Sequence, residues 1–250
     1  MMLADEVYAN VGSTELRVDA LVQDGSPVPA IVCIHGGGWV SGDRTDMHEV
    51  AQYFSARGFA AFCPQYRLAP LYGYPAPIED IEAFMKYLRD NSEKLGILPE
   101  SVGVIGNSAG GYLATMTGLT NNEESRANAV VDICGLTDLT NYRESHPPIS
   151  WDFLVQYMAG ATADDPKWIE ASPIFRVNAD APPFLIFHGD EDDVVYIEQS
   201  ERLFEALKQA GVSVEFEKLQ GEGHSFTMPA FTRILEKSTD FFRAKLGVAV

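Results

Sequence analysis

The sequence has no apolar run long enough to cross a membrane. A membrane-spanning helix needs about 20 consecutive apolar residues, and polar or charged side chains interrupt every apolar run in this chain well before that length. Residues 1–10 also lack the basic start and apolar block of a secretory signal peptide. We therefore expect a cytoplasmic protein, although a chain trimmed of its leader would have the same sequence.

Cysteine is scarce, with only Cys33, Cys63 and Cys134 in the chain. Each lies in an apolar, strand-like run, and none has the spacing of metal ligands. An odd number of cysteines in such surroundings indicates reduced thiols in the core. We expect neither a disulfide framework nor a metal site, which agrees with a cytoplasmic location.

Positive charge is also scarce. The chain has 18 Lys and Arg against 36 Asp and Glu, which gives a formal net charge of −18. This excess of negative charge repels nucleic acid and anionic membrane surfaces, so we expect neither as a partner. The acidic residues are expected to form a well-solvated surface.

The chain does contain alternating strand-like and helix-like segments. Its 250 residues, of which 46% are hydrophobic, predict a single domain with a sizeable core. Residues 6–10 and 16–22 flank a turn signal and predict an antiparallel hairpin. From residue 30 onward the alternation requires a mainly parallel sheet with helices on both faces, an α/β fold. Further strands are expected at residues 30–34, 59–64, 102–105, 129–134, 184–187 and 212–218 (the last at a sheet edge), and helices at 46–56, 78–91, 112–119, 197–210 and 233–245.

Residues 135–173 do not follow this alternation. Their periodicity is weak and they are rich in aromatic residues, so short helices are expected at about 151–158 and 166–171. A connection this long is often a functional lid. We expect a small lid or cap insertion here, with a hydrophobic cluster under a loop as the alternative. His146, beside two prolines, is expected at the surface.

The stretch Gly106-Asn107-Ser108-Ala109-Gly110 follows an apolar strand and precedes a buried helix. Gly-x-Ser-x-Gly in this context predicts a sharp turn with Ser108 at its tip, in a strained conformation and with an exposed hydroxyl. Gly106 and Gly110 would allow strand and helix to approach closely. The N–H of Ala109 would face the same space, next to the positive end of the helix.

Three consecutive glycines, Gly36 to Gly38, end the strand at residues 30–34. Backbone N–H groups of such a loop can approach a ligand closely, and in acyl transfer they stabilise an oxyanion. No Gly-Lys-Ser/Thr follows, which excludes a P-loop, and no dinucleotide-binding fingerprint is present. A flexible turn is the alternative to an oxyanion loop.

A serine nucleophile needs a histidine base, and the histidine needs a carboxylate to orient it. His224, between Gly223 and Ser225 in a loop after the last strand, is the best candidate base; His35, His48 and His188 have positions that suit structural roles better. Four carboxylates could orient it: Asp192, Asp190, Asp193 and Asp138. All of these residues follow strands whose carboxyl ends meet at one edge of a parallel sheet, where ligands bind.

Five motifs in this order resemble the α/β-hydrolase superfamily, in particular the HGGG-type esterases similar to hormone-sensitive lipase and their small acetyl- and feruloyl-esterase branch. They are His35-Gly36-Gly37-Gly38-Trp39, Tyr66-Arg67-Leu68-Ala69-Pro70, Gly106-Asn107-Ser108-Ala109-Gly110-Gly111, His188-Gly189-Asp190-Glu191-Asp192 and Gly223-His224. The resemblance implies an α/β-hydrolase fold, Asp192 as the acid, and the amides of Gly37, Gly38 and Ala109 as the oxyanion hole. It implies no cofactor.

The chain departs from this resemblance in lacking a sizeable N-terminal helical cap. A small cap, or one formed by residues 135–173, favours an open pocket and short or aromatic acyl groups. Aromatic residues of these regions either line the pocket or simply pack: Trp39, Tyr142, Trp151 and Tyr157.

The sequence therefore predicts a serine carboxylic-ester hydrolase. Ser108, Asp192 and His224 would act through an acyl-enzyme on a small-molecule ester. An amide-cleaving relative, such as an arylformamidase or an exopeptidase, is one alternative. A non-catalytic small-molecule-binding protein on the same fold is another, but such proteins commonly lack one of the three catalytic side chains.

Overall fold

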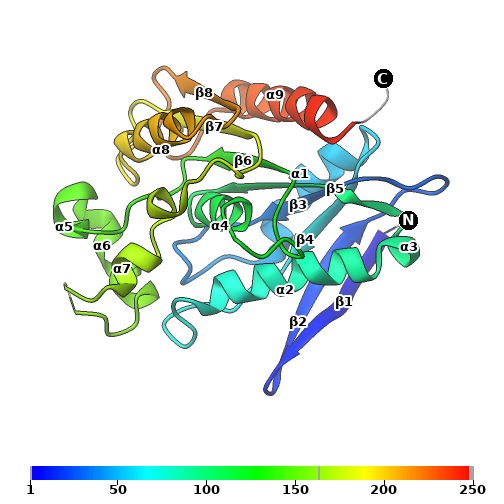
Figure 1. Cartoon of the computed structure of the whole chain (residues 1–250), viewed down its shortest axis with the longest axis horizontal. Helices are drawn as coiled ribbons and strands as arrows, with labels where there is room; N and C mark the ends of the chain where they lie inside the picture. Colours follow the sequence, from blue (N-terminus) through cyan, green and yellow to red (C-terminus); the bar gives the residue numbers. More distant parts are fainter. Residues whose placement is uncertain (1, 163, 248–250) are drawn as a thin grey trace.

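A computed structural model describes residues 2–162 and 164–247 and shows one eight-stranded sheet with helices packed on both faces (Figure 1). The strand order is β1-β2-β4-β3-β5-β6-β7-β8. The strands are β1 (Met2–Val11), β2 (Thr14–Leu21), β3 (Val28–Ile34), β4 (Ala60–Pro64), β5 (Ile97–Asn107), β6 (Ala129–Ile133), β7 (Phe184–Gly189) and β8 (Val214–Leu219).

The pairing of the strands confirms the expected mainly parallel sheet. Strand β2 is antiparallel to both β1 and β4, and β3 to β8 are paired in parallel. The register places Ile34 beside Gly106, and Gly106 beside Asp132, so three strands end at one level. This edge carries the candidate residues, as expected for a parallel sheet. Strand β8 lies at the sheet edge, as predicted.

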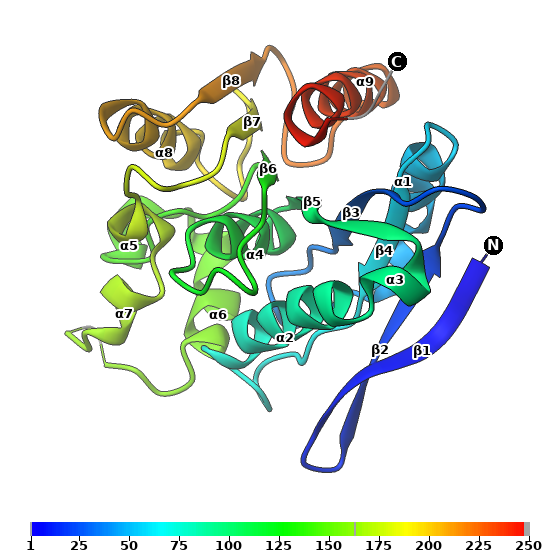
Figure 2. The same ribbon diagram turned by 45° about the vertical axis from the view of Figure 1, so that its right-hand side comes forward.

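The helices divide between the two faces. Apolar residues of α1 and α9 form one core with the sheet, while α2, α4 and α8 build the larger core on the opposite face (Figure 2). The helices are α1 (His48–Ser55), α2 (Ala76–Asp90), α3 (Ser92–Leu95), α4 (Ala109–Gly118), α5 (Tyr142–Ser145), α6 (Pro148–Tyr157), α7 (Lys167–Glu170), α8 (Glu198–Gln209) and α9 (Met228–Leu246), with short 3-10 helices at Arg44–Met47 and Pro173–Arg176.

Helix α1 begins two residues later than expected because a capped turn precedes it. The Asp43 carboxylate accepts a hydrogen bond from the Thr45 amide at 3.0 Å, and the Asp43 amide donates to the Asp46 carboxylate at 2.9 Å. This reciprocal capping box stabilises the 3-10 turn at Arg44–Met47. It also fixes the position of Asp46.

Residues 135–173 carry α5, α6 and α7, which gather at one side of the molecule, on the left in Figure 1. Their role as a lid stays a prediction. His146 is buried, with 2% of its surface exposed, and its Nε2 lies 2.8 Å from the Asp138 carbonyl oxygen. The expectation of a surface histidine was wrong, because this segment folds back against the chain that follows β6.

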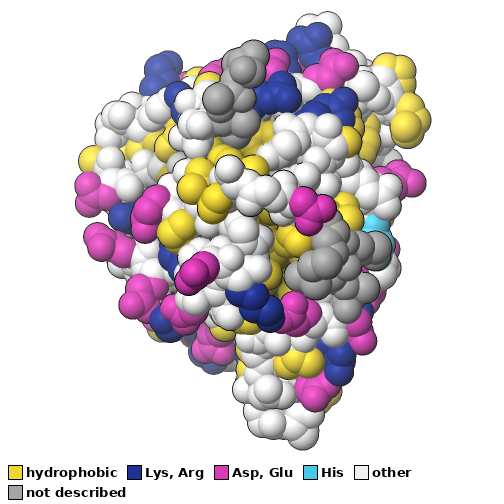
Figure 3. Space-filling model, turned by 90° about the vertical axis from the view of Figure 1, so that its right-hand side faces the viewer, with side chains coloured by type: hydrophobic (Ala, Val, Ile, Leu, Met, Phe, Trp, Pro, Cys, Tyr) yellow, Lys and Arg dark blue, Asp and Glu magenta, His cyan; other side chains and the backbone are white. Residues whose placement is uncertain are grey.

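Cys33, Cys63 and Cys134 are buried free thiols, as predicted. Within the described part of the chain, no helix combines the length and the apolar character that crossing a bilayer requires. The face shown in Figure 3 carries acidic and basic side chains interspersed with apolar ones.

Candidate active site

The turn between β5 and α4 has the sharp geometry that the sequence predicted. Ser108 has φ 54° and ψ −121°, a strained conformation for a residue with a side chain. A Cβ on Gly106 would lie 2.3 Å from the backbone of Gly110, and one on Gly110 would lie 2.1 Å from the Ile34 carbonyl oxygen. Strand and helix therefore approach too closely for any residue but glycine at both positions.

Ser108 is more covered than expected. Only 7% of its surface is exposed, because the turn is packed against the end of β6, where the Ser108 amide donates to the Ile133 carbonyl at 2.8 Å. Phe153 of α6 lies over the glycine loop, within 2.9 Å of where a Cβ on Gly38 would be. The serine is thus held in a confined space beside that loop.

Asp192 is the carboxylate that faces His224. Its Oδ2 lies 2.7 Å from Nδ1 of His224, although 32 positions separate the two residues in sequence. The other candidates have different partners. Asp190 accepts from the Gly221 amide at 2.7 Å, Asp138 pairs with Arg202 at 2.6 Å, and Asp193 is exposed.

A second histidine contacts the same carboxylate oxygen. Nε2 of His188 lies 3.2 Å from Asp192 Oδ2 and 2.8 Å from the Val195 carbonyl oxygen. Both partners can only accept, so Nε2 carries the hydrogen. From sequence, His188 was expected to have a structural role. Its position at a strand end before Gly189 was the one signal that it lies close to the site.

Opposing effects set the pKa of Asp192. Burial by itself would raise it, but hydrogen bonds from His188, His224 and the Val195 amide lower the pKa of this carboxyl below its ordinary value. Its other oxygen accepts from the amides of Val194 at 2.9 Å and Val195 at 2.8 Å. Asp192 is therefore a charged, fully hydrogen-bonded group that can orient an imidazole.

The glycine loop presents amides without partners. Gly37 has φ 105° and Gly38 has φ 60°, and a Cβ on Gly37 would lie 2.2 Å from the Ser41 carbonyl oxygen. Among the described residues, no acceptor takes a hydrogen bond from the amides of Gly37, Gly38 or Ala109. Such amides beside a serine can bind a developing negative oxygen.

A cavity of about 540 Å³ opens beside the loop and the histidine. Its lining includes Gly36 and Gly37 of the glycine loop, His224, and Asn107, the neighbour of Ser108. The cavity extends toward α1 and α9. The glycine loop, the serine turn and the histidine loop therefore meet around one space.

The four aromatic residues considered for the pocket pack against other parts of the chain. Trp39 and Tyr157 are fully buried and stack with ring centroids 4.2 Å apart. Tyr142 stacks on Trp168 at 5.1 Å, and Trp151 donates to the His146 carbonyl at 3.0 Å. The lining of the 540 Å³ cavity, as far as the described residues go, includes none of the four.

Cys134 lies close to the Asp192–His224 pair. Potential ligand atoms of the three residues are within 4.8 Å of one another. Burial raises the pKa of the Cys134 thiol, so the sulfur stays protonated at neutral pH. The imidazole of His224 and the carboxylate of Asp192 are already hydrogen-bonded to each other. The three residues therefore suit a catalytic-type hydrogen bond better than the binding of a metal ion.

Comparison with known proteins shows the family of the chain. Residues 20–207 match the BD-FAE family. The chain belongs to the BD-FAE family of α/β-hydrolases. Esterase LipC of Mycobacterium tuberculosis is 32% identical over 217 residues, which cover 81% of this chain and 54% of that protein. The dipeptidyl aminopeptidase BIII of Pseudoxanthomonas mexicana is 27% identical over 88% of this chain and 33% of that protein. This BD-FAE chain spans about half the length, or less, of these curated relatives.

Solved structures share the fold over nearly the whole BD-FAE chain. A truncated carbohydrate esterase from gut microbiota has a TM-score of 0.85 and 26% identity, covering 99% of this chain and 97% of that one. Esterase 2 of Thermogutta terrifontis, phosphonylated by sarin, also has a TM-score of 0.85, with 25% identity over 96% of this chain and 94% of that one. The predicted α/β-hydrolase fold is confirmed.

Proposed function

We propose that this protein hydrolyses carboxylic esters through Ser108, His224 and Asp192. The observation that carries the proposal is the 2.7 Å contact between His224 Nδ1 and the buried Asp192 carboxylate, in a loop that shares one cavity with the serine turn and the glycine loop. The names of similar esterases support the same activity.

In the proposed reaction, His224 takes the proton of the Ser108 hydroxyl as the oxygen attacks the ester carbonyl. Asp192 holds the imidazole with Nδ1–H toward itself, which leaves Nε2 as the base. The amides of Gly37, Gly38 and Ala109 bind the oxyanion. His224 then gives its proton to the departing alcohol, and water releases the acid from Ser108 by the same steps.

Short or aromatic acyl groups, such as acetyl or feruloyl groups, suit the confined serine best. Phe153 packs over Gly38, and Ser108 is 7% exposed, so space on the side of α6 is restricted. Amide cleavage is the second candidate, supported by the similarity to a dipeptidyl aminopeptidase. A small-molecule-binding role without catalysis is the third.

Substitution of the serine tests the proposal. Ser108→Ala should abolish p-nitrophenyl acetate hydrolysis, leaving at most ~10³–10⁴-fold acceleration over water. Asp192→Asn should lower kcat by about 10⁴-fold, because the imidazole loses the partner that fixes its tautomer. Rates are measured for acetyl, feruloyl, formyl-kynurenine and aminoacyl-nitroanilide substrates.

Asp193→Asn is the matched control, since it removes a neighbouring carboxylate that is exposed and that, among the described residues, has no hydrogen bond or ion pair with His224. It should retain wild-type rates. Unchanged hydrolysis by Ser108→Ala would overturn the proposed mechanism. Faster cleavage of the amides than of the esters would favour the second candidate, and binding without reaction with a fluorophosphonate would favour the third.

We also infer a cytoplasmic location, supported by three buried free thiols that suit a reducing compartment. The inferred partner is a small-molecule ester, and the net charge of −18 favours neither nucleic acid nor an anionic membrane.

A further inference from the structure

The 540 Å³ cavity borders the histidine but not the serine. His224, Ser225 and Phe226 contribute to its lining, whereas Ser108 does not. The cavity lies between the glycine loop and helices α1 and α9, on the opposite side of the sheet from α4 and the core that α6 joins. It therefore lies on the other side of the sheet from the core against which Phe153 packs.

This difference in lining decides which half of an ester the cavity can hold. In an acyl-enzyme the acyl group is bonded to the serine oxygen, so its pocket must include Ser108. The leaving oxygen receives its proton from the histidine, so the alcohol lies next to His224. A compartment that His224 lines and Ser108 does not matches the alcohol part.

One carboxylate marks this compartment. Asp46 lines the cavity, and the structure gives only one of its oxygens a hydrogen-bond partner, the Asp43 amide. Nearby cations do not neutralise it. Arg44 is paired with Asp19 at 2.9 Å and with Asp5 at 2.8 Å. Burial lowers the pKa of His35, which keeps that imidazole neutral.

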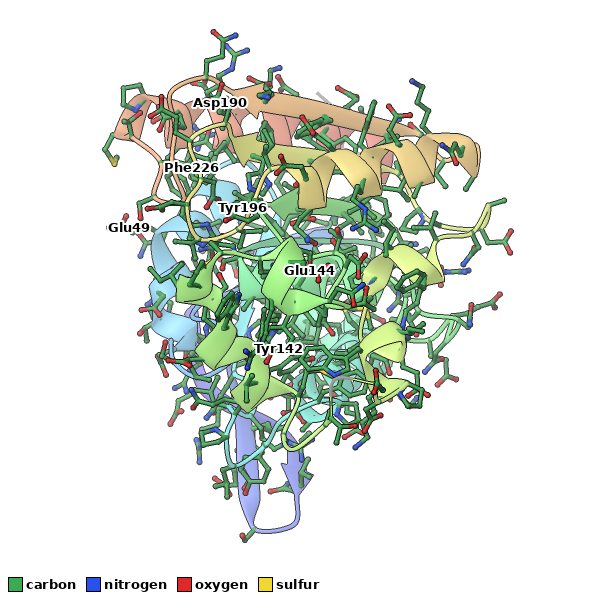
Figure 4. The ribbon with its side chains drawn as sticks, turned by 90° about the vertical axis from the view of Figure 1, so that its left-hand side faces the viewer. Glu49, Tyr142, Glu144, Asp190, Tyr196 and Phe226 are labelled. Carbon is green, nitrogen blue, oxygen red and sulfur yellow. The ribbon has the colours of Figure 1, made fainter. Side chains whose placement is uncertain are left out.

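The other walls are mainly apolar. Met47 ends the 3-10 turn before α1, Val50 lies in the first turn of α1, and Phe231 and Leu235 come from α9. An apolar space with a single carboxylate suits an organic cation, whose methylene or methyl groups contact the walls while its charge faces Asp46. Figure 4 shows Phe226, which lines the cavity, and Glu49 of α1 at the same edge of the molecule.

We propose that this cavity is the subsite for the alcohol part of the ester, and that Asp46 makes it select alcohols with a positively charged group, such as amino alcohols. The proposal rests on the proposed ester hydrolysis. It assigns the cavity between α1 and α9 a role in specificity, and it identifies Asp46 as the residue that distinguishes positively charged from neutral leaving groups.

Two pairs of substrates test this. Acetylcholine and 3,3-dimethylbutyl acetate have the same shape and differ by a positive charge in the alcohol. Betaine ethyl ester and ethyl 3,3-dimethylbutanoate place the same difference in the acyl group. Asp46→Asn keeps an oxygen that can accept from the Asp43 amide and removes the charge.

We expect Asp46→Asn to lower kcat/KM for acetylcholine about two- to fivefold relative to its neutral isostere, as for an ion pair with an exposed carboxylate. The ratio for the acyl-charged pair should not change. Added salt should weaken the acetylcholine preference of the wild type and have little effect in the variant. Glu49→Gln, which removes a charge on α1 outside the cavity lining, is the control and should leave both ratios unchanged.

Phe231→Trp provides a second variant, since a larger ring fills the cavity from α9. It should lower kcat/KM for acetylcholine and for 3,3-dimethylbutyl acetate, which have bulky alcohol parts, more than for methyl acetate. An unchanged acetylcholine ratio in Asp46→Asn, or an equal change in the acyl-charged pair, would overturn the subsite. If none of the esters is hydrolysed, the proposed function fails as well.

Discussion

Asp192 is the residue on which the geometry of the site depends. Its Oδ2 lies between two imidazoles, 2.7 Å from His224 and 3.2 Å from His188. His188 is in turn held by Ser200, whose Oγ lies 2.7 Å from Nδ1. All of this arrangement except His224 is buried. The orientation of the partly buried His224 imidazole is thus determined by a buried hydrogen-bond network below it.

We expect His188 to act as a positioning residue. In His188→Leu, Asp192 loses one of its hydrogen-bond donors, so its negative charge acts on His224 with one competing partner fewer. The acid limb of the pH profile of kcat/KM should therefore move to higher pH. The profile is measured with a neutral ester.

His188→Gln restores a donor near the position of Nε2 and should return the limb toward its wild-type position. Thermal unfolding of both variants separates folding defects from the shift. If both variants lose stability but keep the wild-type profile, His188 has only a packing role.

At the level of elements, an aromatic cluster joins the glycine loop, α4 and α6. The Trp39 ring stacks on Tyr157 at 4.2 Å and meets the edge of Tyr112 at 4.9 Å. The Tyr157 hydroxyl donates to that of Tyr112 at 3.2 Å, and Tyr112 donates to the Ala171 carbonyl at 2.8 Å. Residues 135–173 are thereby packed against the site. Movement of this segment as a lid would have to break these contacts.

Tyr157→Ala should weaken this connection. The lost ring leaves a cavity in the core, and the free energy of unfolding should fall by about 3–5 kcal/mol, as for other buried aromatics. Urea unfolding measures the loss.

Tyr157→Phe is the matched comparison, because it keeps the ring and removes only the hydroxyl. It should cost about 1 kcal/mol. Equal losses in the two variants would show that the hydrogen bond, and not ring packing, fastens α6.

The whole molecule carries more negative than positive charge. The net charge of −18 leaves acidic residues in excess even where ion pairs such as Arg67–Asp80, at 2.7 Å, use the positive ones. Like charges repel over a compact surface more than in an extended chain. The folded state therefore carries an electrostatic cost that depends on screening.

We expect the thermal unfolding midpoint to rise when NaCl is increased from ~0.01 M to ~0.15 M, because the Debye length falls from ~30 Å to ~8 Å. Calorimetry at constant pH measures the midpoint. KCl should act equally, since screening does not distinguish the two cations. A constant or falling midpoint would contradict the expectation.

The sequence by itself determined the features that depend on local backbone geometry. Glycine at positions 106 and 110 allows the sharp turn around Ser108, and the apolar strands at residues 30–34 and 129–133 require a sheet buried on both faces. The order of strands and helices then places the candidate residues at one edge of the sheet. These conclusions need no knowledge of which side chains touch.

Only the tertiary structure decided which side chains meet. From sequence, four carboxylates were candidates to orient His224. The structure selects Asp192, because the loop after β8 places His224 Nδ1 2.7 Å from its carboxylate. The same folding buries His146, turns Trp39 and Tyr157 into the core, and leaves the alcohol-side cavity between α1 and α9. Such contacts depend on how distant segments pack, and a one-dimensional pattern does not contain that information.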